Sequence, residues 1–144
     1  MKLKKFDRIF IDDMHERGIP ILRVVVGVVF LWFGLLKLFD VTPVFDLVAD
    51  TYSFVPTRSF ILALGVWEVL IGFGLIIHFR LRVVLLLLWL QMFGTLFAVF
   101  LSPSLFFVNA NPLLLTMEGE FIVKNFVFIA ASIVIGGFEI KRKL

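Results

Sequence analysis

A charged residue in the middle of an apolar stretch is the first sign of chemistry in this sequence. The stretch from Ala63 to Phe73 reads ALGVWEVLIGF, and Glu68 is its single residue that is neither apolar nor glycine. An ionised carboxylate without a partner is costly in apolar surroundings, so it becomes neutral or finds a partner. Such residues by default face a bundle interior or a cavity and mark functional sites. Glu68 is therefore the candidate proton-holding or proton-relaying group.

Another apolar stretch carries two basic groups on one helical face, with glycines between them. The members of that face are separated by four, three, four and three positions: Arg23, Gly27, Phe30, Gly34 and Lys37. The glycines permit a close approach of a neighbouring helix. Lys37 lies near the end of its stretch, and we expect its ammonium to extend outward to the membrane surface. It is also one of the candidate ligand-binding residues, together with the network described next.

Glu68 shares a helical face with Gly65 and Gly72, and the remaining apolar stretches add polar residues at similar depth. The sequence predicts a buried network in which a basic residue approaches the carboxylate from either side and two amides form hydrogen bonds. Its members are Arg23, Glu68, Lys124, Gln91 and Asn125. Two interpretations stay open. The network binds a ligand or moves a proton, or it only fastens helices together, at about 0.6 kcal/mol per interhelical hydrogen bond.

The aromatic residues allow a similar pair of interpretations. Trp32, Trp67 and Trp89 lie inside the apolar stretches instead of at interface depth. They either pack the core or line a pocket for a flat apolar ligand, and Trp32 and Trp67 are the candidate lining residues.

Other chemistries find little support. The sequence has no cysteine, which excludes disulfides, thiol chemistry and iron–sulfur clusters. Two membrane histidines can hold a haem, but His15 and His78 are better read as solvated interfacial residues, with His78 as a proton relay to a quinone as the alternative. No metal-binding, nucleotide-binding or hydrolase motif occurs, so we expect no metal site.

Composition identifies the elements that must position these residues. The chain has 144 residues, is 61 % hydrophobic and has a mean hydropathy of +1.08. A soluble domain of this size would expose one large apolar patch. Four apolar runs approach the roughly 20 residues that a membrane span requires, and they cover residues 20–38, 59–77, 83–101 and 121–138. We expect one domain over residues 1–144, an all-α four-helix membrane bundle.

The basic residues predict the orientation of this bundle. Ten of them lie before the first span, between spans two and three, or after span four, whereas the other two connections contain only Arg58. The positive-inside rule therefore places both termini in the cytoplasm. These positions explain the basic residues without any nucleic-acid partner.

Two shorter segments are expected to be helical. Residues 1–18 read as an amphipathic helix on the inner membrane surface, which ends at the sequence RGIP before the first span. In the first outer connection, Thr42 followed by Pro43 is a helix-start signal. That short helix lies along the outer interface or folds over the bundle as a lid.

Three of the four spans resemble the DoxX-like family, and in particular its YkgB-like relatives. The stretches that carry the resemblance are RVVVGVVFLWFGLLKL at 23–38, GVWEVLIGFGLII at 65–77 and EGEFIVKNFVFIAASIVI at 118–135. The resemblance implies a four-span inner-membrane protein. Some members are linked to quinol oxidase or thiosulfate:quinone oxidoreductase complexes, and others to oxidative stress. No family set of catalytic residues carries over to this chain.

Three functions follow as expectations. The first is a redox-linked or accessory membrane protein that binds a quinone-like or lipid-like molecule, with a respiratory or redox protein as partner. The second is a small transporter or channel subunit that uses Glu68, as a homo-oligomer. The third is a non-catalytic assembly subunit.

Overall fold

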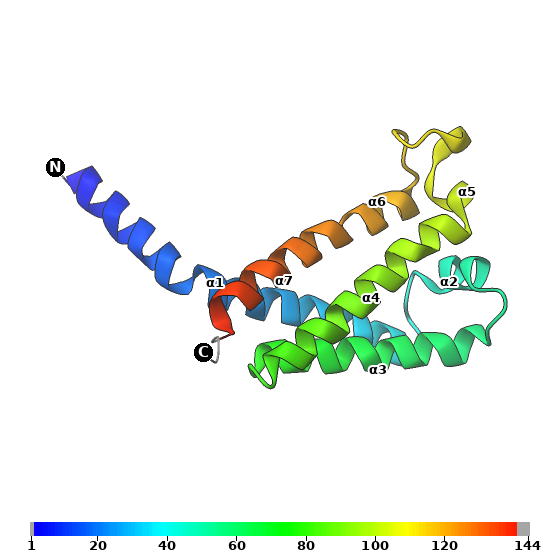
Figure 1. Ribbon diagram of the computed structural model, residues 1–144, viewed down its shortest axis with the longest axis horizontal. Coiled ribbons are helices and arrows are strands. Elements are labelled where there is room, and N and C mark those ends of the chain that lie inside the picture. Colours follow the sequence, from blue (N-terminus) through cyan, green and yellow to red (C-terminus); the bar gives the residue numbers. More distant parts are fainter. Residues whose placement is uncertain (1, 141–144) are drawn as a thin grey trace.

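The computed structural model describes residues 2–140 and, within them, is helical with no β-strand (Figure 1). Side chains are described from residue 7 onward. The elements in chain order are α1 (Lys2–Leu38), α2 (Phe45–Thr51), α3 (Thr57–Ile76), α4 (Leu81–Leu101), α5 (Pro103–Phe106), η1 (Val108–Ala110), α6 (Met117–Val123) and α7 (Asn125–Glu139).

Four helical segments within residues 2–140 are long and apolar enough to cross a membrane. Each has at least the roughly 20 residues that a bilayer requires, and they are Asp7–Leu38, Thr57–Ile76, Leu81–Leu101 and Met117–Glu139. The prediction of four spanning helices is therefore confirmed, and four such helices indicate a multi-pass membrane protein.

The spanning helices pack in a ring in which α1 contacts α3, α3 contacts α4, α4 contacts α7, and α7 contacts α1. One end of the bundle holds the α3–α4 turn at residues 77–80 and the end of α7, and we call it the hairpin end (Figure 1). The opposite end, called the loop end, holds the connections at residues 39–56 and 102–116.

Glycines set the register of α1 against α3, the most extensive contact between two helices. A Cβ added to Gly27 would lie 2.9 Å from the Gly72 carbonyl oxygen, and one added to Gly34 would lie 2.7 Å from that of Gly65. The predicted glycine faces of the two helices therefore meet in antiparallel pairs. Since no side chain fits between the backbones, this contact fixes which residues of α1 and α3 lie side by side.

The expected end of the N-terminal helix at RGIP is wrong, because α1 runs without interruption from Lys2 to Leu38. Pro20 lies inside it, and the helix changes direction in that region (Figure 1). Proline removes one backbone hydrogen bond and clashes with the preceding turn, which bends a helix without ending it when the flanking turns hold.

The helix predicted in the first connection is present as α2, but it begins at Phe45 instead of next to Thr42. Of the two arrangements considered, α2 folds back over the bundle. Its Leu47 and the following Tyr52 pack beside a cluster formed by Ala98, Phe106 and Ile122, and the Tyr52 hydroxyl donates to the Gly94 carbonyl of α4 at 3.0 Å.

At the hairpin end, α3 closes with a Schellman motif. The backbone N–H of Phe79 donates to the Gly74 carbonyl at 2.9 Å, and that of His78 to the Leu75 carbonyl at 3.4 Å. This motif needs a left-handed residue, usually glycine, and here His78 adopts φ 58°. The motif places the imidazole at the end of the bundle beside α7.

Candidate functional site

The site is a buried cluster of three polar side chains from three spanning helices. The Lys37 ammonium of α1 lies 2.7 Å from Oε2 of Glu68 on α3. Gln91 of α4 donates its amide Nε2–H to the other carboxylate oxygen, Oε1. All three residues are buried, and each side chain of the ion pair is 9 % exposed. The cluster, named the Lys37–Glu68–Gln91 triad, lies near the middle of α3 and α4.

The predicted partners of Glu68 are corrected by this arrangement. The carboxylate pairs with Lys37 and not with Arg23 or Lys124, and the Lys37 ammonium turns inward instead of outward. The reason is the glycine register of α1 and α3. A Cβ on Gly65 would meet the Lys37 side chain at 3.0 Å, which puts Lys37 one helical turn from Glu68.

Arg23 belongs to a separate cluster at the hairpin end. Its Nε lies 2.7 Å from Oε2 of Glu139, and His78 Nε2 lies 3.4 Å from the same oxygen. Arg23 Nη1 also donates to the carbonyls of Leu75 and Ile76 at the end of α3. A cation there is favourable because the last carbonyls of a helix lack partners and carry negative partial charge.

Lys124 and Asn125, adjacent in sequence, point to different surroundings. Lys124 separates α6 from α7 and is exposed, with its ammonium 5.1 Å from the centre of the Phe121 ring. Asn125 instead donates to the Thr95 hydroxyl of α4 at 2.8 Å. Asn125 therefore extends the polar interior toward the loop end, whereas Lys124 lies outside it.

An apolar layer separates the triad from the hairpin-end cluster. Its side chains are fully buried and come from three helices: Ile71, Leu75, Leu88 and Ile135. Water and ions are excluded from such close-packed layers. We call the part of the bundle from this layer to residues 77–80 the hairpin half, and the part that holds the triad and Thr95–Asn125 the loop half.

The tryptophans divide between packing and the outer surface. Trp67 donates to the Leu87 carbonyl at 3.0 Å, and Trp89 to the Ser132 hydroxyl at 2.7 Å, so both link helices of the bundle. Trp32 is 64 % exposed on the outside of α1, where it lines a hollow of about 240 Å³. Trp32 therefore does not line the interior around Glu68.

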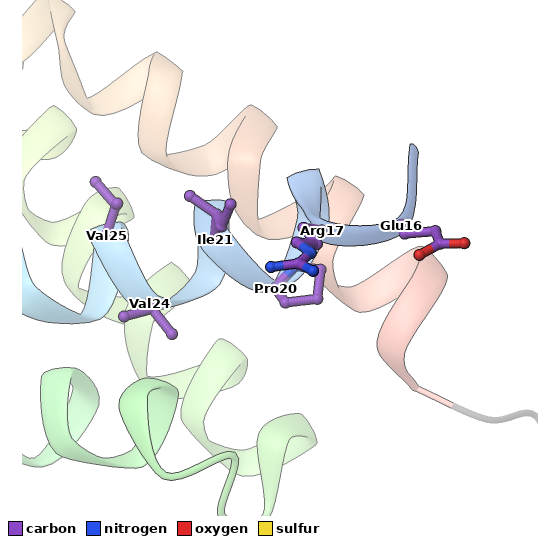
Figure 2. Close-up of a pocket in the computed structure, with 6 residues that line it drawn as sticks. All are labelled: Glu16, Arg17, Pro20, Ile21, Val24 and Val25. Atoms are coloured by element: carbon purple, nitrogen blue, oxygen red, sulfur yellow. The ribbon is translucent and has the colours of Figure 1, made fainter. Parts of the chain in front are cut away.

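A second hollow, of about 340 Å³, lies where α1 bends at Pro20 (Figure 2). All of its lining residues come from α1 itself: Glu16, Arg17, Pro20, Ile21, Val24 and Val25. Both hollows are thus on the outer surface of one helix and do not include the triad.

Three residues of these clusters were not among the sequence-based candidates. Glu139 lies one residue beyond the predicted fourth span, Tyr52 lies in a connection, and Thr95 is a small uncharged residue that the charge-based search passed over. The pairing of Lys37 with Glu68 did have a signal. Each of the two helices has a pair of glycines seven residues apart, Gly27 with Gly34 and Gly65 with Gly72. These two pairs match when the helices are aligned antiparallel.

Comparison of the chain with protein-family models, with curated proteins and with solved structures gave no match in any of the three.

Proposed function

We propose that this chain is a bacterial inner-membrane protein that binds an apolar small molecule, quinone-like or lipid-like, in the loop half of its bundle. The hairpin end faces the cytoplasm in this proposal, following the distribution of basic residues. The resemblance to the DoxX-like family supports a redox-linked or accessory role beside a respiratory or redox protein.

The observation that carries the proposal is the buried Lys37–Glu68 ion pair, which lies near the middle of α3. A buried ion pair adds little stability compared with well-packed apolar side chains, because both ions lose their hydration. Fastening the helices would need no charges, since glycine packing already joins α1 to α3. A charge pair with an adjacent amide is instead suited to hold the polar head of an amphipathic molecule.

In this proposal Lys37 and Gln91 bind the polar head, and Glu68 holds or relays a proton. Asn125 lies on the route from the loop end through its contact with Thr95. Arg23 closes the hairpin end and Lys124 faces outward, so neither is retained as a ligand-binding residue.

The transporter alternative receives less support, because it requires a water path from Glu68 to both ends. The apolar layer of the hairpin half stands in that path. The assembly-subunit alternative is favoured by a specific observation: Trp89 with Ser132, and Asn125 with Thr95, are paired within the bundle and need no ligand.

Mass spectrometry of small molecules extracted from the gently purified protein tests the proposal. We expect an apolar molecule near one per chain in the wild type and its loss from the variant Glu68→Gln, which keeps the shape of the side chain. Arg23→Gln at the hairpin end is the matched control and should retain the molecule. Equal amounts in Glu68→Gln and the wild type, or no bound molecule in either, would leave the assembly role as the better account.

A further inference from the structure

The hollow at the bend of α1 has a charged end and an apolar end (Figure 2). Glu16 and Arg17 carry its charged groups, and the apolar end is lined by Ile21, Val24 and Val25. All five residues are exposed, so a molecule from the surroundings can reach every part of the lining. A hollow with these two ends is suited to an amphipathic molecule.

The position of the hollow along α1 places it at a membrane surface. Arg23 marks the end of the bundle, because it contacts the last carbonyls of α3 and Glu139 at the end of α7. Arg17 comes six residues before Arg23, which is roughly 9 Å further along a helix. The headgroup layer of a bilayer is about 5–8 Å thick on each side. The charged end of the hollow therefore lies among lipid headgroups, and the apolar end lies beside the first part of the acyl chains.

Arg17 is positioned to bind a phosphate. Its Nε lies 2.8 Å from Oδ1 of Asp13, one helical turn earlier. A guanidinium has five N–H donors, so the contact with Asp13 leaves donors for a second anion. Arginine binds phosphate oxygens well because its planar fork of donors matches their geometry. The Arg17 side chain is 71 % exposed, and a lipid phosphate can approach it directly.

Glu16 adds a second requirement to the headgroup. An ionised carboxylate only accepts hydrogen bonds, and it repels a headgroup whose charge is purely negative. Glu16 beside Arg17 thus complements a headgroup that has both a phosphate and an ammonium. A primary ammonium has three N–H donors for the carboxylate, whereas a quaternary ammonium has none.

We infer that this hollow binds a phospholipid with a primary ammonium in its headgroup, such as phosphatidylethanolamine. Arg17 contacts the phosphate, Glu16 accepts from the ammonium, and an acyl chain lies along Ile21 and Val24. The site lies at the opposite end of the bundle from the loop half, so the inference is independent of the ligand proposed there.

Native mass spectrometry of the full chain in detergent tests the inference with three phospholipids that have identical acyl chains. They are phosphatidylethanolamine, phosphatidylcholine and phosphatidylglycerol. We expect one molecule of the first to bind per chain, about fivefold more tightly than either of the others, as for a favourable exposed charge pair. Equal affinities for the three lipids would overturn the inference.

Variants at the charged end assign the preference to single residues. Glu16→Gln keeps the shape of the side chain, and it should bind the ethanolamine and choline lipids equally. Arg17→Gln should bind all three lipids more weakly. The matched controls are exposed residues at the loop end, Glu120→Gln and Arg58→Gln, and both should behave as the wild type. An unchanged preference in Glu16→Gln would contradict the assignment.

A second copy of the chain is the competing occupant of the hollow. Because the sequence has no cysteine, Val24→Cys introduces a single thiol there. We expect this variant to stay monomeric under oxidising conditions in bilayers that contain phosphatidylethanolamine. Efficient disulfide crosslinking between two chains would show that a second copy covers the hollow, and it would overturn the inference.

Discussion

The two halves of the bundle each contain a basic–acidic pair, but the pairs are built differently. In the hairpin half, Arg23 and Glu139 meet at the very end of the bundle, where Arg23 also caps the last carbonyls of α3. In the loop half, Lys37 from the end of α1 meets Glu68 near the middle of α3, and Gln91 is a third member. The first pair closes a helix end, whereas the second has no comparable structural task.

An apolar layer lies between the two pairs and separates an apolar interior from a polar one. Ile71, Leu75, Leu88 and Ile135 are fully buried, so the hairpin half is closed by ordinary packing. On the other side of this layer, polar groups continue from the triad to Thr95 and Asn125. An interior that is apolar on one side and polar on the other is suited to a molecule that enters from the loop end and stops at the triad.

Breaking the loop-half pair should have the largest effect on stability. Lys37→Met leaves the Glu68 carboxylate buried without its cation, and we expect a loss of about 3–5 kcal/mol in the free energy of unfolding. The double variant Lys37→Met/Glu68→Leu removes both charges and should regain most of that loss. Unfolding in mixed micelles measures the free energy of unfolding of the single and the double variant. Losses that simply add in the double variant would mean that the pair is not coupled.

The glycine register that creates the pair can be tested next. Gly72→Ala would force a Cβ against the backbone of Leu31 and the Gly27 carbonyl, with an expected loss of about 1–3 kcal/mol. Gly137→Ala is the control, because a Cβ there meets nothing within 4 Å. The melting temperatures of the two variants should separate clearly. Similar melting temperatures would contradict the close approach of α1 and α3.

The hairpin-half pair should be weaker than the loop-half pair. Arg23→Gln keeps a hydrogen-bond donor for the α3 carbonyls but removes the charge beside Glu139, and we expect a loss of about 1–2 kcal/mol. Chemical unfolding in detergent measures this loss. A loss as large as that of Lys37→Met would erase the distinction between the halves.

The smallest effect is expected where α2 attaches to the loop half. Tyr52→Phe removes the hydrogen bond to the Gly94 carbonyl and should cost about 0.5–1.5 kcal/mol. Burial raises the pKa of the Tyr52 hydroxyl above its ordinary value of 10. The folded state therefore favours the neutral hydroxyl, and this contribution is complete below pH 10 and lost as pH rises through the raised pKa. Stability curves at pH 8 to 12 should show that loss in the wild type and lack it in Tyr52→Phe.

The sequence was sufficient to predict four spanning helices and the faces on which their glycines and charges lie. Apolar length and helical spacing are local properties, and they determined the face that carries Gly27 and Lys37 as well as that of Glu68. The partner of Glu68 depends on how two helices are shifted along each other, which no single helix encodes. The depth of each residue along its span favoured Arg23 and Lys124 as the partners of Glu68. In the structure, glycine packing between α1 and α3 instead places Lys37 at the Glu68 carboxylate.

Two other differences between the predicted and the observed structure, at Pro20 and Lys124, also have local causes. A proline in the first turn of a predicted span looks the same in sequence whether it begins a helix or bends one, so Pro20 did not reveal that α1 continues through it. Lys124 looked buried because its neighbours are apolar, but it lies at the break between α6 and α7 and faces outward.

A crystal structure of the chain purified from its native membrane, without added lipid, tests the central claim most directly. The account predicts elongated non-protein density in the loop half, with its polar head within hydrogen-bonding distance of the Lys37–Glu68–Gln91 triad. Side chains packed continuously around the triad, with no non-protein density beside them, would contradict it.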